Sequence, residues 1–452
     1  MASVNIIQKK VMFEYGRADA EYFHPDIVGD IGRLHHYLVE RVGDFANVTD
    51  GIHSSPDIDD SGSGVVYLSA KSVRNNEITV CGTLNISWEQ HKNNKRSSLE
   101  PGDVIISTVG TIGNAAVVTE YVGTANCDRH LGIIRIKETA DVSPFYVSAF
   151  LNCRYGKMQS HRESTGNVQL NLFIEKIKTI QVPRLKCEQE VSFDVEQAIQ
   201  CVESAKARLR ELEEYVESVV FVSYDRPTLK KTYEAQLGEI SAEKRVDAEY
   251  YQPAKKECVD ILSSDGGEGI TKHFDVVRQI FNPRSHRSDE RVINYDLTDA
   301  LEPFLGADQD LEEVGDIGSS KWIVKSGDLV ISRLRSYLKE VSLVVGSSSV
   351  TRVCSSEFIV LRPKKGGELS VSTALAFLRC SPVQLILHWS QDGSNHPRFS
   401  RKELDDICIP NRVANLDGYI HSIIGESVDA LRRGRGLLQN SLRKIENEID
   451  SQ

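Results

Sequence analysis

The sequence has little that would suit a membrane or secreted protein. None of its segments approaches the ~18 uninterrupted apolar residues that a membrane-spanning helix requires. Its nine cysteines are an odd number, form no CxxC pair and are scattered from Cys81 to Cys408. That pattern excludes a regular disulfide framework and a zinc ribbon, and it is typical of the reducing cytoplasm. The opening residues lack an apolar segment followed by a small-residue cleavage site. We therefore expect a cytoplasmic protein with no membrane partner.

Positive charge and catalytic motifs are also scarce. The 452 residues carry 54 Lys and Arg against 65 Asp and Glu, which gives a net charge of −11 and an isoelectric point of about 5.6. Proteins that coat DNA draw most of their affinity from neutralising phosphates, so this balance disfavours a free-standing, non-specific DNA binder. It still allows a protein with small basic faces that works inside a larger assembly. The sequence contains neither a GxxxxGK(S/T) phosphate loop nor an HExxH metal motif, and we predict no catalytic residue and no metal site.

An internal repeat organises the chain. Matched segments occur twice in the same order, at offsets between 225 and 228 residues. The matched pairs include 17–25 (RADAEYFHP) with 245–253 (RVDAEYYQP), 102–107 (GDVIIS) with 327–332 (GDLVIS), Cys127 with Cys354, and Arg135 with Arg362. The chain therefore consists of two copies of one unit. A repeat of this length indicates duplicated domains rather than a solenoid.

A long helix is predicted at the end of each copy. Apolar residues from Val191 to Val219 alternate at steps of four and three, which is the seam pattern of a coiled coil. The same alternation extends from Ile424 to Ile449 and is broken only by Arg435. Either helix alone could pack on its own domain as an ordinary amphipathic helix. Two seams at equivalent ends of two repeats favour an antiparallel intramolecular coiled coil, because each seam needs a partner.

Between the helices, each copy has the pattern of a mixed domain. Strand-like runs come first and helical runs follow, which indicates an α+β fold rather than a doubly wound sheet. The strand-like runs include 64–68, 104–107, 115–118, 132–136 and 358–361, and the helical runs include 144–151 and 372–378. We predict two homologous α/β domains separated by two long helices. The expected boundaries are 1–186 for the first domain, 187–222 for its helix, 223–240 for a connector, 241–413 for the second domain and 414–452 for its helix.

The repeated segments resemble one protein family. They are Arg-x-Asp-Ala-Glu-Tyr near the start of each copy, GDVIISTVGTIG at 102–113, SGDLVISRLRSYL at 326–338, TGNVQLNL at 165–172, and the closing Ile-x-Val/Ile-Pro at 180–183 and 407–410. In this order, present over nearly the whole chain, they resemble the DNA-specificity (S) subunits of type I restriction–modification systems, which serve antiviral defence. The two domains would then be target recognition domains.

The resemblance implies a division of labour. Each target recognition domain would recognise half of a bipartite sequence in double-stranded DNA, and the paired helices would set the distance between the halves. The same helices would dock two methyltransferase (M) subunits, and motor-nuclease (R) subunits would join for restriction. The chain itself would be non-catalytic and hold no cofactor, whereas S-adenosylmethionine, ATP and Mg would belong to the partner subunits. In agreement, the sequence lacks the Asn/Asp-Pro-Pro-Tyr/Phe motif of methylation.

Polar side chains that could contact DNA follow the strand-like run 104–107 of the first copy. Thr108, Thr111 and Asn114 can bond phosphates or base edges, which makes them candidate DNA contacts. The alternative is a tight turn between strands, in which the glycines at positions 110 and 113 supply a positive φ.

The aligned stretch of the second copy is basic. It loses both glycines and carries Arg333, Arg335 and Lys339. If Arg333 and Arg335 continue a strand, they share one face, and an Arg fork matches guanine or phosphate. We predict these three residues as DNA contacts, and a solvated charged strand is the alternative.

Two further pairs of cations occupy polar stretches after predicted strands. Lys71 and Arg74 lie in KSVRNN of the first copy, and Arg284 and Arg287 lie in FNPRSHR of the second. Lys, Arg and Asn within a few residues suit contacts to phosphates and adenine. An exposed polar turn is the alternative for the first pair.

Recurring polar loops at 166–171 and 393–398 provide the last candidates. Asn171 belongs to the first loop, and Asn395 and Arg398 belong to the second. Their side chains can reach base edges, but Asn and Gly also form turns without any contact to DNA.

Two other functions compete with DNA recognition in a type I system. The chain could be a scaffold or DNA-recognition subunit of another antiphage assembly with this architecture. It could also be a lone DNA-binding regulator, which the isoelectric point disfavours. A neighbouring methyltransferase gene would favour the type I assignment.

Overall fold

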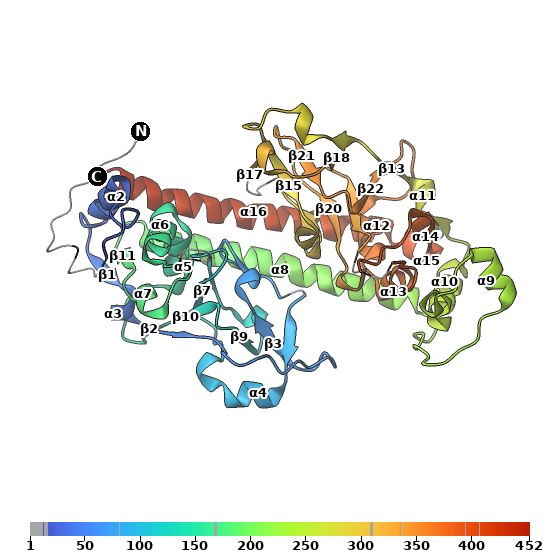
Figure 1. Cartoon of the computed structure of the whole chain (residues 1–452), viewed down its shortest axis with the longest axis horizontal. Coiled ribbons are helices and arrows are strands. Elements are labelled where there is room, and N and C mark those ends of the chain that lie inside the picture. The colour runs from blue at the N-terminus through green and yellow to red at the C-terminus, as the bar shows by residue number, and fades with distance from the viewer. Residues whose placement is uncertain are drawn as a thin grey trace. The chain divides into compact units, whose positions relative to one another are not determined.

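The computed structural model describes residues 12, 17–80, 82–166, 170–307, 311–334, 336–393, 395–405 and 407–452, with the backbone alone for Tyr337 (Figure 1). The described chain divides into two compact units. Unit 1 contains the residues up to Ser204 together with Ala430–Gln452, and unit 2 contains Ala205–Asp429. Each unit holds one copy of the repeat and part of each long helix, whereas the sequence pattern placed every helix in a segment of its own.

A four-stranded antiparallel sheet in the order β2-β10-β7-β8 forms the centre of unit 1. Strand β7 is buried along its whole length, and successive side chains of a strand point to opposite faces. Val104 and Ile106 pack with helices, whereas Ile105 packs with residues of a second sheet in the order β6-β3-β9. The strands are β1 (Val39–Arg41), β2 (Ala46–Asp50), β3 (Val65–Leu68), β4 (Val73–Arg74), β5 (Glu77–Ile78), β6 (Leu84–Ile86), β7 (Val104–Ser107), β8 (Ala115–Val117), β9 (Ala125–Cys127), β10 (Leu131–Ile136) and β11 (Gln181–Pro183).

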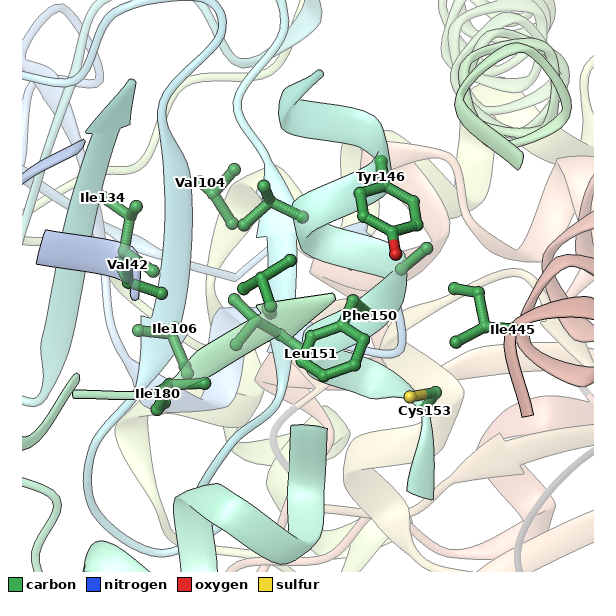
Figure 2. Packing of buried hydrophobic residues seen from close by; sticks show 14 of the residues in the cluster. Val42, Val104, Ile106, Ile134, Tyr146, Phe150, Leu151, Cys153, Ile180 and Ile445 are labelled. Carbon is green, nitrogen blue, oxygen red and sulfur yellow. The ribbon is translucent and has the colours of Figure 1, made fainter. Parts of the chain in front are cut away.

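The main core of unit 1 lies between this central sheet and helices. Figure 2 shows Phe150 and Leu151 on the helical side and Ile106 on the sheet, all fully buried. Ile445 of the long C-terminal helix belongs to the same cluster, so part of that helix is built into the core of unit 1. The shorter helices are α2 (Pro25–Leu34), α3 (Val42–Phe45), α4 (Trp88–Asn93), α5 (Pro144–Asn152), α6 (Arg154–Glu163) and α7 (Ile174–Ile177).

Unit 2 repeats the arrangement with two five-stranded sheets. The central sheet has the order β13-β22-β19-β20-β16, and the second has the order β14-β18-β21-β15-β17. The run β13-β22-β19-β20 matches β2-β10-β7-β8 of unit 1 in order and in antiparallel pairing. The strands are β12 (Glu268–Gly269), β13 (Phe274–Val277), β14 (Ile280–Phe281), β15 (Arg291–Tyr295), β16 (Phe304–Leu305), β17 (Leu311–Glu313), β18 (Lys321–Val324), β19 (Leu329–Ser332), β20 (Val341–Val344), β21 (Arg352–Cys354), β22 (Phe358–Pro363) and β23 (Cys408–Ile409).

Short helices surround these sheets in unit 2. They are α9 (Leu237–Glu243), α10 (Pro253–Ser263), α11 (Ile270–His273), α12 (Val371–Leu378), α13 (Ser381–Trp389), α14 (Arg401–Asp405) and α15 (Asn411–Ala414). Over the described part of the chain, no single helix has the length and apolarity of a membrane span, although the pair α12 and α13, bent by 67°, meets both criteria together. The predicted connector 223–240 contains the start of α9.

The two long helices are α8 (Glu188–Val220) and α16 (Asp417–Asp450), and they run antiparallel within each unit. In unit 1, Lys444 forms ion pairs with Glu190 and Asp194, while Gly434 lies against Ala198. Residue numbers thus rise along one helix as they fall along the other. In unit 2, the pairs Arg208 with Glu426 and Tyr215 with Tyr419 show the same polarity. The predicted antiparallel coiled coil is confirmed in both units.

Buried contacts recur at equivalent positions of the two units. Asp103 accepts two bonds of 2.7 Å from Arg135, and Asp328 accepts two bonds of 2.6 Å from Arg362. Both aspartate side chains are 1% exposed. The first residues of α6 and α13 also match, because their backbone N–H groups donate to a glutamate of a long helix, Glu446 in unit 1 and Glu217 in unit 2. The repeat found in the sequence is therefore a repeat of structure.

Candidate nucleic-acid interface

Two adjoining stretches of unit 1 connect its central sheet with its smaller sheet. They are the β2–β3 loop, residues 51–64, and the first part of the connection between β6 and β7, residues 87–98, here called the β6–β7 segment. Gln90 of the segment joins them, because its Nε2 donates to the carbonyl of Ser55 at 2.9 Å and its Oε1 accepts from the N–H of Asp57 at 2.8 Å. Trp88 adds a bond of 2.9 Å from its Nε1 to the carbonyl of Ser63. These bonds fix the position of the segment against the loop.

The inner side of the β6–β7 segment is polar and bonded. Asn126 of β9 is fully buried, and its Oδ1 lies 2.5 Å from Nδ1 of His91. The Nδ2 of Asn126 donates to Ser97 Oγ at 3.2 Å. Because an unpaired buried amide is costly, both ends of Asn126 anchor the segment.

The outer side of the same segment is basic. Lys92, Lys95 and Arg96 are all exposed, and Arg96 pairs with Asp50 at 2.8 Å. Within the described residues, neither Lys92 nor Lys95 has an ion-pair partner. These residues were not among the contacts predicted from the sequence, because they belong to no motif. The basic run HKNNKR at 91–96 is the feature of the sequence that indicates them.

The corresponding stretches of unit 2 adjoin each other in the same way. They are the β13–β15 loop, residues 278–290, and the β17–β18 segment, residues 314–320. Backbone bonds of 2.8 Å from Val314 to Glu290 and of 2.9 Å from Gly315 to Ser288 join them. As in unit 1, the two stretches flank a pair of antiparallel strands. The loop leads into one strand of the pair, β3 or β15, and the segment follows the other, β6 or β17.

The predicted contacts Arg284 and Arg287 lie on the β13–β15 loop and are exposed. The loop itself is anchored, because Phe281 is buried and its ring stacks on His286 with centroids 4.3 Å apart. Arg287 pairs with the neighbouring Asp289 at 2.5 Å. The anchored loop thus presents two guanidinium groups to solvent, as DNA recognition would require.

The basic stretch of unit 1 corresponds to a stretch without Lys or Arg in unit 2, and the reverse holds for the other stretch. In unit 1, the β2–β3 loop has three carboxylates and no Lys or Arg, whereas the β6–β7 segment has three cations and one carboxylate. In unit 2, the β13–β15 loop has three arginines and two carboxylates, whereas the β17–β18 segment has one carboxylate and no Lys or Arg. Each unit therefore places its cations on one of two adjoining stretches, and the choice differs.

Arg74 lies on the hairpin β4–β5, and Lys71 lies on the 3-10 turn 70–72 that precedes it; both are exposed. The hairpin turns at Asn75 and Asn76, which have φ of 46° and 65°. Glu77 of the hairpin pairs with Arg435 of α16 at 2.8 Å, which explains the polar residue in the helix seam. The role of Lys71 and Arg74 as DNA contacts stays a prediction.

The loop after β7 corrects one prediction. Thr108 is only 2% exposed, so its hydroxyl is not available to DNA, and we withdraw it as a contact. Gly110 and Gly113 have φ of 75° and 83°, as the tight-turn alternative requires. Thr111 is exposed and Asn114 is half-buried, and both stay predicted contacts.

The basic stretch after β19 also differs from the prediction. The strand ends at Ser332, so Arg333 does not continue it, and its Nε donates to the carbonyl of Phe399 at 3.2 Å. Arg335 lies outside the described residues. Lys339 Nζ is 3.8 Å from Glu213 of α8, which places its ammonium group at the long helix rather than on an outer loop. The prediction that Arg333 continues the strand, and so shares a strand face with Arg335, was therefore wrong.

The last candidates lie on the recurring polar loops. Asn171 is half-buried and pairs through its backbone with Thr165, and Asn395 is exposed. Arg398 makes two bonds of 2.7 and 2.8 Å to Glu357, and these bonds hold the pKa of Glu357 below its ordinary value. The Nη1 of Arg398 donates to the carbonyl of His396 at 2.8 Å, so all three nitrogens of this guanidinium already bond to the protein.

The described residues provide no metal-binding cluster, and the thiols of Cys153 and Cys258 are buried. No group of three or more His, Cys, Asp or Glu side chains there could hold a metal ion. Burial raises the pKa of Cys153 and of Cys258 to about 12, so these thiols stay protonated and are poor nucleophiles at neutral pH.

The solved structures that this chain resembles include two from type I restriction–modification systems and one HsdS subunit. The S subunit from M. genitalium has 11% sequence identity and a TM-score of 0.40, over 90% of this chain and 95% of its own. The HsdS subunit from Thermoanaerobacter tengcongensis has 12% identity and a TM-score of 0.29, over 92% and 95%. A chain from a study of complex assembly and conformational transition of the type I system has 12% identity and a TM-score of 0.27, over 92% and 96%. No family model matches this chain, and no curated protein matches it in sequence.

Proposed function

We propose that this chain recognises a bipartite sequence in double-stranded DNA as the specificity subunit of a type I restriction–modification complex. The observation that carries the proposal is the duplicated unit. Each unit has the same central sheet, the same buried ion pair and the same antiparallel combination of α8 with α16. Two related but non-identical domains joined by long helices suit a target made of two different half-sites with a spacer between them.

Charge and exposure support DNA as the ligand. The exposed arginines and lysines of the outer loops lie on anchored backbone, and Arg forks bond both phosphates and guanine. The chain as a whole has a net charge of −11, so its basic faces are local. We infer that partner subunits surround much of the DNA and supply the remaining electrostatic attraction.

The proposed partners are two methyltransferase subunits that dock on the long helices, and motor-nuclease subunits that join for restriction. A repeated structure offers two equivalent docking surfaces, which is the arrangement that two copies of one partner require. S-adenosylmethionine, ATP and Mg would be bound by those partners, and this chain would contribute no catalytic group.

Sequencing of modified bases tests the proposal directly. Genomic DNA is compared between cells with the gene, cells without it and cells complemented by the wild-type gene, using long reads that detect methylated bases. We expect one bipartite methylated motif that disappears on deletion and returns on complementation. A methylome that is identical in all three strains would contradict the proposal. It would favour a subunit of another antiphage assembly if the chain still purifies in a stable complex that lacks a methyltransferase.

A further inference from the structure

The two units carry their positive charges on different members of the pair of adjoining stretches, although the repeat predicts the same member in both. The β6–β7 segment of unit 1 and the β17–β18 segment of unit 2 both follow an edge strand, β6 or β17. Each edge strand pairs antiparallel with the strand next to it, β3 or β15. The two segments are equivalent in the fold, yet the first has three cations and the second has none. The basic stretch of unit 2 is the other member of the pair, the β13–β15 loop.

The acidic member of each pair is poorly suited to DNA. The β2–β3 loop of unit 1 contains Asp57, Asp59 and Asp60, and like charge opposes the approach of phosphates. In unit 2, the β17–β18 segment contains Asp316 and follows Glu312 and Glu313 of β17. A DNA backbone is therefore attracted to a different stretch in each unit.

We propose that the two domains contact DNA through non-equivalent stretches, unit 1 through Lys92, Lys95 and Arg96 and unit 2 through Arg284 and Arg287. This assignment presupposes the proposed DNA recognition and specifies which residues perform it. Lys92 and Lys95, which lack an ion-pair partner within the described residues, neutralise phosphates. Arg96, oriented by Asp50, presents its fork to a base edge.

The structure gives the β6–β7 segment of unit 1 the rigidity that recognition needs. Its inner side is fixed through His91, Ser97 and the buried Asn126, and Gln90 fixes it to the β2–β3 loop. A segment that is ordered before binding loses little conformational entropy when DNA arrives. The outer cations can therefore contribute to affinity without a folding step.

The test compares variants of the full chain, purified with any subunits that stay bound, on a library of duplexes with a randomised central region. One variant is K92A/K95A/R96A, a second is R284A/R287A, and K230A/K231A serves as the control because both lysines are exposed on the connector. Bound duplexes are sequenced. We expect wild type and control to select a motif of two blocks, the first variant to lose one block, and the second variant to lose the other.

Affinity for the selected duplex provides a second readout. Each of the two variants is expected to bind that duplex ~10²-fold more weakly than wild type, since a base-contacting Arg and its neighbours discriminate by this order. The double variant K92A/K95A keeps the bond between Arg96 and Asp50, so it isolates the phosphate contacts. It should lower the slope of log affinity against log salt by roughly two, because two phosphates are no longer neutralised.

Three outcomes separate this assignment from the proposed function. If K92A/K95A/R96A is folded and selects both blocks with wild-type affinity, the assignment is overturned while DNA recognition stands. If that variant has a lower unfolding temperature, K92A/K95A decides by its salt slope. If wild type selects no motif, DNA recognition itself is contradicted, and this assignment fails with it.

Discussion

Unit 1 and unit 2 agree in their interiors and differ on their outer loops. In both, an arginine of the last long strand bonds a nearly inaccessible aspartate that directly precedes the neighbouring strand. A glutamate of a long helix also caps an equivalent short helix in each unit. Of the two adjoining stretches, by contrast, the β6–β7 segment carries the exposed cations in unit 1 and the β13–β15 loop carries them in unit 2. Exposed charges contribute little to stability, so the loops can exchange charge without disturbing the fold. The comparison teaches that the interior sets the architecture and the loops set what each domain contacts.

The largest expected effects test whether both units depend equally on the helix seam. Leu209 of unit 2 and Leu438 of unit 1 are 5% and 6% exposed. We expect Leu209→Ala and Leu438→Ala each to lower the free energy of unfolding by ~2–5 kcal/mol, because each leaves a cavity in the seam. Hydrogen exchange measured by mass spectrometry would locate the loss in each unit.

Phe193→Ala is the matched control on the same helix, because Phe193 is 63% exposed. It should change stability by no more than ~0.5 kcal/mol. An equal loss for Phe193→Ala and Leu209→Ala would contradict the seam packing.

A second test asks whether the recurring ion pair contributes equally to the stability of both units. Arg135→Ala and Arg362→Ala each leave a carboxylate whose side chain is 1% exposed without its guanidinium. We expect losses of ~2–4 kcal/mol that agree with each other, since breaking one side of a buried pair strands a charge and both arginines are partly solvated. Urea unfolding measures the loss, and a twofold or larger disagreement would break the equivalence of the two interiors.

Two glycines of α16 provide a smaller test of helix contact in unit 1. A Cβ at Gly434 would lie 2.8 Å from the carbonyl oxygen of Ala198 and 2.9 Å from Val202, whereas one at Gly436 would meet nothing within 4 Å. We expect Gly434→Ala to destabilise by ~1–3 kcal/mol and Gly436→Ala to stabilise by ~0.5–1 kcal/mol. Thermal unfolding of both variants gives the sign, and two shifts of the same sign would be inconsistent with the close approach.

The smallest effect concerns an ion pair that belongs to unit 2 alone. Positions 227 residues before Glu357 and Arg398 hold His130 and Asn171, so unit 1 has no such pair. Because the bonds from Arg398 hold the pKa of Glu357 below its ordinary value, the pair stabilises the fold above the unfolded-state pKa and loses this effect as pH falls through the folded-state pKa. Glu357→Gln should cost up to ~1 kcal/mol at neutral pH and nothing in strong acid. A cost that is independent of pH would contradict the charge interaction.

The repeat and its periodicity made most of the architecture predictable. The alternation from Val191 to Val219 lies within α8, and the runs 104–107 and 144–151 correspond to β7 and α5. These features are local, because a helix seam or a buried strand has a signature within a few residues. The antiparallel polarity followed from the order of the two copies.

The candidate contacts were less predictable because their surroundings are distant in sequence. The burial of Thr108 depends on how the chain closes over the end of β7, and the partner of Arg398 lies 41 residues earlier. Lys339 meets Glu213 of a helix from the other copy of the repeat. The basic run at 91–96 was visible in the sequence, but only the fold shows that its inner residues are bonded and its cations exposed.

The central claim is that two domains of one fold recognise two different half-sites. It is tested most directly by sequencing methylated bases in cells whose only copy of the gene carries Arg284→Ala and Arg287→Ala. We predict that the methylated motif becomes degenerate in one half and keeps its other half and its spacer. A motif that degrades equally in both halves would contradict the claim, whereas an unchanged motif would overturn the assignment of Arg284 and Arg287 to the DNA contact.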